Sequence, residues 1–405
     1  MNALPAASAV GGAAVAVVVV HDGSPGWQLA RVVGAAALTM VVVLVTARAE
    51  DRWRGRVAVG FGAVLAATGA GLLPHAVKSA GTVEVLAGPV ALVAGLVLVV
   101  GGTVAATTGR QLARRLGAAG VSLVIVGMTA LIVAPAVMAT NAPRPELRAT
   151  PHDRGLVYED VAVTTPDDVD LAGWYIPSKN RAAVVLLHGA GSTRSSVLDE
   201  VAVLAHHDFG VLMIDARGHG ESEGQSMDFG WHGDTDVPAA TAFLADRPEV
   251  DADRIGLVGL SMGGEEAIGA SGLDTRIAAV VAEGATARNA ADEAWLSEEF
   301  GVRGAFQEQL ERLQDRLIDF LTSASVPIAG RAAVEASDAQ YLLITAGKVS
   351  DEGHAAAHMA TGAPDRVQIW TVAGAGHTAG LATAPEEWEE RVVSFLSDAL
   401  LGSKP

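Results

Sequence analysis

The chain has 405 residues, of which 50% are hydrophobic and only 18% are charged. This composition is too apolar for an ordinary water-soluble protein and indicates membrane segments. Residues 1–149 carry 11 Lys and Arg against 5 Asp and Glu, a net +6, whereas residues 150–405 carry a net −24. The acidic part disfavours nucleic acid as a partner, and the absence of cysteine excludes disulfides and thiolate chemistry.

Five apolar stretches come first along the chain, at residues 3–20, 32–47, 57–73, 85–107 and 118–139. None of them contains Asp, Glu, Lys or Arg, and a membrane-spanning helix needs about 20 mostly apolar residues. We therefore predict an all-α membrane domain of about five transmembrane helices over residues 1–140. Its many Gly and Ala residues suit close helix packing, which is compatible with a homo-oligomer formed through these helices.

Basic residues indicate how these helices are oriented. Arginines follow the second and fourth apolar stretches, at Arg48, Arg52, Arg54, Arg56, Arg110, Arg114 and Arg115. The segments after the first and third stretches contain only Lys78, together with Arg31 at the very edge of the second stretch. Because Arg-rich loops remain in the cytoplasm, we expect a multi-pass protein of the cell membrane whose residues beyond the fifth helix lie on the extracytoplasmic side.

A linker rich in proline and arginine is predicted at residues 141–153, and a soluble domain at 154–405. Short β-rich runs in that domain lie at residues 157–164, 171–176, 183–187, 211–215, 255–259, 277–282, 341–345 and 367–372. Helical segments alternate with most of them, which predicts an α/β fold with a mostly parallel sheet and helices on both faces. Residues 285–336 contain no clear strand but include an amphipathic helix near 305–321, so we expect a helical cap there.

The sequence Gly-Leu-Ser-Met-Gly at residues 259–263 lies directly between a predicted strand and a predicted helix. A G-x-S-x-G pattern in this position is typical of a tight turn that raises the serine side chain above the sheet. Its glycines let neighbouring backbones approach without a Cβ clash. Ser261 is therefore a candidate nucleophile.

Three further motifs follow predicted strands in chain order: His-Gly-Ala-Gly at 188–191, Asp-Ala-Arg-Gly-His-Gly-Glu-Ser at 215–222, and Ala-Gly-His at 375–377. With the serine turn, they make residues 155–402 resemble the α/β-hydrolase superfamily, whereas residues 1–140 resemble no family that we recognise. The resemblance implies that Ser261 is the nucleophile and His377 the base. It also implies that the backbone N–H groups of Met262 and Ala190 form the oxyanion hole.

The acid that would orient His377 has three candidates. The superfamily commonly carries it as G-x-x-D after the strand at 341–345, but here Asp351 comes one residue late, after Gly347. We expect Asp351 to be the acid, because a carboxylate at that strand end can orient the imidazole. Its neighbour Glu352 and the strand-ending Glu283 are the alternatives.

No metal or other cofactor is expected. His354 and His358 have helical spacing, but the glutamate of a zinc-binding H-E-x-x-H motif is absent between them. The predicted function is that of a membrane-anchored serine hydrolase that cleaves ester, thioester or peptide-like acyl bonds of a small-molecule or lipid-like substrate. The alternatives are a membrane acyltransferase that uses the same serine, and a catalytically idle binding or sensing domain.

Overall fold

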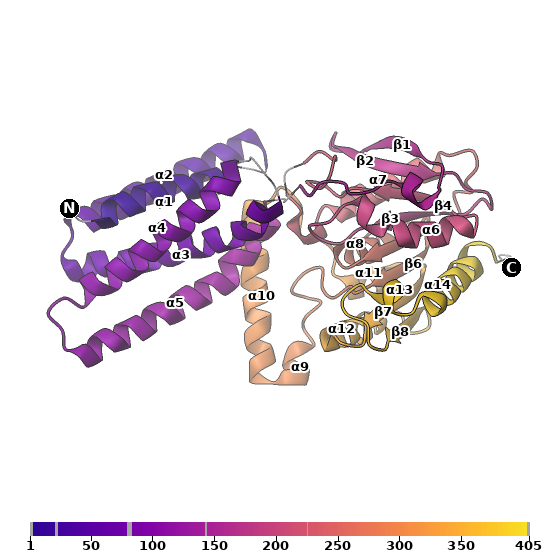
Figure 1. Cartoon of the computed structure of the whole chain (residues 1–405). Helices are drawn as coiled ribbons and strands as arrows, with labels where there is room; N and C mark the ends of the chain where they lie inside the picture. Colours follow the sequence, from indigo (N-terminus) through magenta and orange to yellow (C-terminus); the bar gives the residue numbers. More distant parts are fainter. Residues whose placement is uncertain (1–2, 21–22, 79–82, 142–143, 225, 403–405) are drawn as a thin grey trace. The chain divides into compact units, whose positions relative to one another are not determined.

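A computed structural model of the chain describes residues 3–20, 23–78, 83–141, 144–224 and 226–402 (Figure 1). Residues 142 and 143 of the expected linker lie outside the described residues. The chain divides into two compact units. One comprises residues 1–143 and 309–323, and the other comprises residues 144–308 and 324–405.

The first unit is helical. Five helices form its N-terminal part: α1 (Ala3–Val18), α2 (Pro25–Arg48), α3 (Asp51–Lys78), α4 (Val83–Ala106) and α5 (Leu112–Ala139). Segments of α2 to α5 are long and apolar enough to cross a membrane, over Pro25–Arg48, Asp51–Pro74, Leu86–Ala106 and Leu112–Ala139. Helix α1 has 16 residues, fewer than the roughly 17 to 25 of a typical span. Four of the five expected spans therefore have sufficient length, and the first does not.

Glycine allows the helices α3 and α4 to pack backbone against backbone. A Cβ atom added at Gly62 would lie 2.7 Å from the carbonyl oxygen of Gly95, and one added at Gly95 would lie 2.6 Å from that of Gly62. Gly62 and Gly95 each belong to a series of glycines spaced seven residues apart. The series on α3 is at positions 55, 62 and 69, and the series on α4 is at positions 88, 95 and 102. Larger side chains on this face would force the two helices apart.

The second unit contains one eight-stranded sheet. Its strands are β1 (Glu159–Thr164), β2 (Asp170–Ile176), β3 (Ala183–Leu187), β4 (Gly210–Ile214), β5 (Ile255–Leu260), β6 (Ile277–Glu283), β7 (Gln340–Ala346) and β8 (Val367–Val372). They lie in the order β1-β2-β4-β3-β5-β6-β7-β8. Strands β1, β2 and β4 pair antiparallel, and all pairs from β4 to β8 are parallel. The predicted mostly parallel sheet is confirmed.

Helices cover both faces of this sheet (Figure 1). One hydrophobic core packs the sheet against α7 (Gly233–Ala245), α8 (Met262–Ser271), α11 (Gly330–Ala336) and α12 (Ser350–Ala360). A second core packs the other face against α6 (Leu198–His206) and α14 (Pro385–Leu400). A short helix, α13 (Gly380–Thr383), precedes α14. The central strands are buried on both faces, which explains why they are continuous apolar runs in the sequence.

The segment expected to form a cap contains α9 (Leu296–Phe300) and α10 (Val302–Leu321) before α11. The carboxyl-terminal half of α10 belongs to the helical unit. There the amide of Gln314 donates a hydrogen bond to the Leu131 carbonyl at 2.8 Å, and the Phe320 and Trp27 rings meet edge to face at 5.7 Å. Residues 309–323 therefore pack with the apolar helices, which the sequence pattern did not predict.

Candidate active site

Ser261 occupies a strained turn between β5 and α8. Its φ and ψ are 54° and −120°, a region that a residue with a side chain adopts only when the surrounding structure holds it there. The flanking glycines permit the turn: a Cβ atom at Gly259 would lie 2.1 Å from the Gly263 carbonyl oxygen, and one at Gly263 would lie 2.5 Å from the Leu187 carbonyl oxygen. The structure thus has the tight strand-to-helix turn that the G-x-S-x-G pattern predicts.

The Ser261 hydroxyl begins a chain of hydrogen bonds formed by three side chains. Its Oγ lies 2.8 Å from Nε2 of His377, in the loop after β8. The Nδ1 of His377 lies 2.7 Å from Oε1 of Glu352, in the first turn of α12. The Glu352 side chain is fully buried, whereas half of the His377 side chain is exposed. This arrangement has the geometry of a nucleophile, a base and an orienting acid.

The expectation that Asp351 orients His377 needs correction. The printed hydrogen bond of the Asp351 carboxylate is with the Ser350 hydroxyl, at 3.2 Å, and the residue is exposed. Successive residues of a helix point about 100° apart, so the side chains of Asp351 and Glu352 leave α12 in different directions. Only Glu352, one of the two alternative candidates, reaches the imidazole.

Packing of α12 explains why Glu352 points inward. It is buried together with Ala355, Ala356 and Met359, positions that share one face of a helix. Its second carboxylate oxygen accepts a hydrogen bond from the backbone N–H of Ala346, at the end of β7, at 2.7 Å. The carboxylate is therefore fixed at both oxygens before it meets His377.

Glu283, the other alternative acid, contacts different groups. It accepts hydrogen bonds from the backbone N–H of Gly380 at 2.6 Å and from the indole N–H of Trp388 at 3.0 Å. Burial raises the pKa of its carboxyl. Both donors follow His377 in the chain, so Glu283 anchors the segment after the histidine and does not contact the imidazole itself.

The electrostatics of the site favour a protonated imidazole. The hydrogen bond to Glu352 raises the pKa of His377 above its ordinary value, against the opposing effect of partial burial. Glu265 and Glu283 add smaller effects in the same direction. A base of this kind accepts a proton from a serine hydroxyl more readily than a free imidazole does.

Glu265, in the first turn of α8, supports the neighbouring loop. Its buried side chain accepts hydrogen bonds from the backbone N–H and hydroxyl of Thr286, both at 3.0 Å, and from the backbone N–H of Ala287 at 3.3 Å. Gly284 lies just before that loop at a φ of 70°, and a Cβ atom there would lie 3.0 Å from the His377 ring. The loop after β6 therefore leaves space for the imidazole.

The predicted oxyanion donors lie on either side of Ser261 in the fold. Met262 is the first residue of α8, and Ala190 lies in the loop after β3. That loop approaches the serine closely, since a Cβ atom at Gly189 would lie 3.3 Å from the Ser261 Cβ. Within the described residues, the backbone N–H groups of Met262 and Ala190 donate no hydrogen bond, so both are available to an anionic oxygen.

Two histidines hold the loops after β3 and β4 together. The Nε2 of His188 accepts a hydrogen bond from the Ala216 N–H at 3.0 Å, and the Nε2 of His219 accepts one from the Gly191 N–H at 3.0 Å. Burial lowers the pKa of His188 to about 4, which keeps this ring neutral and able to accept. Both histidines therefore support the geometry of these loops.

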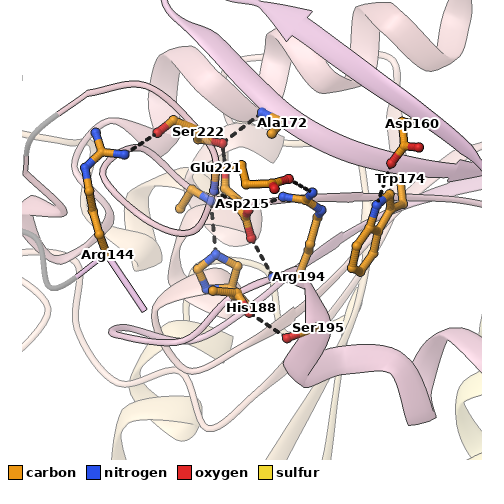
Figure 2. Close-up of polar contacts among 12 residues, drawn as sticks. Arg144, Asp160, Ala172, Trp174, His188, Arg194, Ser195, Asp215, Glu221 and Ser222 are labelled. Carbon is orange, nitrogen blue, oxygen red and sulfur yellow. Dashed lines mark hydrogen bonds and ion pairs between the residues drawn. The ribbon is translucent and has the colours of Figure 1, made fainter. Parts of the chain in front are cut away.

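A buried charge network lies behind these loops (Figure 2). The Arg194 guanidinium pairs with Asp215 and Glu221 and lies 4.3 Å from the centre of the Trp174 ring. Asp215 also accepts hydrogen bonds from the backbone N–H groups of Arg194 at 2.7 Å and Glu221 at 3.0 Å. The network joins the first turn after β3 to the loop after β4, and so limits movement of the segment that carries Ala190.

His354 of α12 packs against an aromatic side chain. The rings of His354 and Trp295 stack at 5.1 Å with an interplanar angle of 11°. Within the described ranges, no group of three or more His, Asp or Glu side chains could hold a metal ion. His354 therefore packs α12 against the segment that precedes α9.

The sheet order, the strained serine turn and the alignment of the serine with a histidine and a carboxylate are those of an α/β hydrolase. Residues 178–325 match the family model described as Serine aminopeptidase, S33. The C-terminal region of the chain accordingly has the α/β-hydrolase fold and matches this family model over residues 178–325, as the sequence motifs predict. The family match leaves the N-terminal helices outside it.

Curated relatives cover part of this region. The chain is 34% identical over 129 residues to the thiohydrolase aneE of Aspergillus aculeatus. The matched segment covers 31% of this chain and 40% of that protein. It is 31% identical over 134 residues to the polyketide transferase grgF of a Penicillium species, spanning 30% of this chain and 43% of that protein. The chain thus matches less than half the length of these relatives.

Among solved structures, an esterase of Pyrococcus furiosus is 26% identical and superposes with a TM-score of 0.52. The superposition covers 64% of this chain and 98% of the esterase. The similarity extends over nearly the whole esterase, so the C-terminal region contains a complete hydrolase fold.

Proposed function

We propose that this protein is a membrane-anchored serine hydrolase that cleaves acyl bonds of the ester or thioester type through a covalent acyl-enzyme. The observation that carries the proposal is the hydrogen-bonded chain from Ser261 through His377 to Glu352. In it, a half-buried hydroxyl meets a base whose other nitrogen is held by a buried carboxylate. An ester and a thioester both present the carbonyl carbon that such a hydroxyl attacks.

In the proposed reaction, the Ser261 Oγ attacks the carbonyl carbon while His377 Nε2 accepts the hydroxyl proton. The backbone N–H groups of Met262 and Ala190 stabilise the resulting oxyanion, a contribution of roughly 3 kcal/mol per donor in comparable sites. His377 then protonates the leaving alcohol or thiol. A water molecule, deprotonated by His377, releases the acyl group and regenerates Ser261.

Thioesters are favoured among the possible substrates by the relative named as a thiohydrolase. A lipid-like acyl substrate is favoured by the four helices that are long and apolar enough to span a membrane. Arginines gather where α2 meets α3 and where α4 meets α5. With those four spans, the positive-inside rule supports an extracytoplasmic hydrolase domain whether or not α1 crosses the membrane.

Acyl transfer is the second candidate function, and relatives named as polyketide transferases favour it. It would use the same acyl-enzyme, with an alcohol or amine replacing water as the acceptor. Mass spectrometry of products formed with and without added glycerol or a primary amine separates the two functions. Acid as the main product supports hydrolysis, whereas an acylated acceptor formed in preference to acid supports transfer.

The proposal is tested by labelling the full-length protein in detergent with a fluorescent fluorophosphonate. The wild type should be labelled, whereas Ser261→Ala and His377→Ala should lose the label. Ser394→Ala is the matched control, since this serine is exposed on α14, and it should be labelled like the wild type. Equal labelling of the wild type and Ser261→Ala would overturn the assignment of the nucleophile. If folded wild type takes up no label and turns over no ester or thioester, the catalytically idle alternative is favoured.

A further inference from the structure

The helical unit contains a cavity of about 350 Å³ between α3, the end of α4 and the start of α5. Four arginines line it: Arg52, Arg56, Arg110 and Arg114. Within the residues that the structure describes, none of these four guanidinium groups forms an ion pair with a carboxylate. The cavity lining therefore carries positive charge that no paired carboxylate of the described residues neutralises.

Acidic residues near the cavity do not neutralise it. Glu50 lies between α2 and α3, and Asp51, the first residue of α3, pairs with Arg54 at 3.1 Å. Neither Arg54 nor the two acidic residues line the cavity. The Gln111 side chain does not cap the amino terminus of α5, whose backbone dipole adds a further partial positive charge at the same end.

Below the arginines, the cavity wall is apolar and contains Val59, Val121 and Ile125. Deeper hydroxyl groups bond to one another or to the backbone: Thr103 Oγ1 lies 2.8 Å from Ser122 Oγ and 2.7 Å from the Val99 carbonyl oxygen. An apolar wall with satisfied hydroxyl groups suits a hydrocarbon chain better than a second charge.

The packing of α3 against α5 explains why a cavity forms here. Near the carboxyl end of α5 the two helices touch, since a Cβ atom at Gly71 would lie 2.5 Å from the Ala134 carbonyl oxygen. Toward its amino end, α5 diverges from the bundle (Figure 1). The cavity lies on that diverging side, where Ala118 and Val121 line it.

We propose that this cavity binds an anionic phospholipid, with the lipid phosphate held by the four arginines and one acyl chain lying along the apolar wall of α3 and α5. Clusters of basic residues between transmembrane helices suit anionic lipid headgroups, because Arg forms paired hydrogen bonds with phosphate oxygens. A zwitterionic lipid offers the same chain but brings a positive group toward the arginines. The site therefore discriminates by headgroup charge.

The test is native mass spectrometry of the full-length protein, purified in detergent and incubated with dioleoyl phosphatidylglycerol or dioleoyl phosphatidylcholine. The wild type should retain phosphatidylglycerol and bind phosphatidylcholine at least tenfold more weakly. Arg110→Gln with Arg114→Gln should weaken phosphatidylglycerol binding by roughly tenfold or more, at about 1 kcal/mol for each charge removed. Ala118→Phe, which fills the cavity and removes no charge, should weaken it similarly.

The matched control is Arg48→Gln with Arg115→Gln, because it removes two charges from the same end of the bundle and neither residue lines the cavity. This variant should bind phosphatidylglycerol within about twofold of the wild type. Equal losses in the control and the Arg110/Arg114 variant would overturn the proposal in favour of diffuse surface charge. Undiminished binding by Ala118→Phe would also overturn it, provided that circular dichroism shows the variant to be folded.

A competition experiment with glycerol phosphate tests whether the site requires the whole lipid or only its headgroup. Millimolar glycerol phosphate should not displace bound phosphatidylglycerol, because it lacks the chain that the apolar wall accommodates. Complete displacement would show a site for a soluble phosphate compound and would contradict the assignment to a lipid. None of these measurements depends on the activity proposed for Ser261.

Discussion

The Nδ1 of His377 lies 2.7 Å from the carboxylate of Glu352, whereas the neighbouring Asp351 is exposed at the surface of α12. The two acids are adjacent in the sequence and differ in length by one methylene. Substitutions of the two residues can therefore be compared directly, because only Glu352 contacts the imidazole.

Replacement of Glu352 by Gln should reduce kcat/KM for a p-nitrophenyl ester on the order of 10³-fold or more. The amide keeps the size of the side chain but cannot stabilise the imidazolium that forms during attack. Replacement of Asp351 by Asn should change kcat/KM by no more than about twofold. A large loss in the Asp351 variant together with an active Glu352 variant would reverse the assignment of the acid.

The pH dependence of kcat/KM should reflect the environment of His377. The imidazole must be neutral to accept the serine proton, so activity falls as the pH drops through its pKa. The hydrogen bond to Glu352 raises that pKa, so the acidic limb should lie above the pH of about 6.5 expected for an ordinary histidine.

In Glu352→Gln, the main cause of the raised pKa is removed, and the acidic limb of the residual activity should move to lower pH. Steady-state kinetics between pH 4.5 and 9 in a constant-ionic-strength buffer measures this shift. A limb that stays at the same pH in the variant would mean that another group titrates.

Asp215 should be more important for stability than Glu221, although both pair with Arg194. The side chains of Arg194 and Asp215 are almost fully buried, whereas the Glu221 side chain is 64% exposed. Asp215→Asn leaves a buried guanidinium poorly compensated and should destabilise the hydrolase unit by about 3 kcal/mol. Glu221→Gln should cost less than about 1 kcal/mol.

Urea unfolding monitored by near-ultraviolet circular dichroism compares these two variants with the wild type. Equal midpoints for the two variants would contradict a buried network that depends on Asp215.

Gly259 should tolerate no side chain. A Cβ atom there would lie 2.1 Å from a backbone oxygen, so Gly259→Ala must distort the turn that carries Ser261. We expect loss of fluorophosphonate labelling and a lower unfolding midpoint. Gly353→Ala is the control, because no atom lies within 4 Å of a Cβ atom at this helical position, and it should be neutral or stabilising by up to about 1 kcal/mol.

Much of the hydrolase fold could be predicted from the sequence because its strands are buried on both faces. Such strands are short runs of apolar residues, as at β3 and β5, and their ends are marked by glycine-rich loops. The turn at Ser261 was also predictable, because backbone contacts require both of its glycines. A Cβ atom at Gly259 would meet the backbone of Gly263, and one at Gly263 would meet the end of β3.

The acid was harder to predict, because its identity depends on where α12 begins. A shift of one residue in the helix start would point position 351 in the direction that position 352 now has. The apolar phase of the helix was the available signal: Glu352 shares a face with Ala355, Ala356 and Met359, and Asp351 does not. The superfamily pattern G-x-x-D favoured Asp351 instead.

The packing of residues 309–323 with the apolar helices was also outside what local patterns predict. The sequence of α10 is amphipathic, which indicates a buried face but not its partner. The contact between Gln314 and Leu131 joins residues 183 positions apart, and no short-range pattern encodes such a pairing.

The most direct measurement is the mass of the full-length protein quenched in acid during turnover of a p-nitrophenyl ester. The proposed mechanism predicts one added acyl group, located by peptide mapping on Ser261 and absent from Ser261→Ala, which should also lose turnover. An acyl group on another residue, or undiminished turnover by Ser261→Ala, would contradict it.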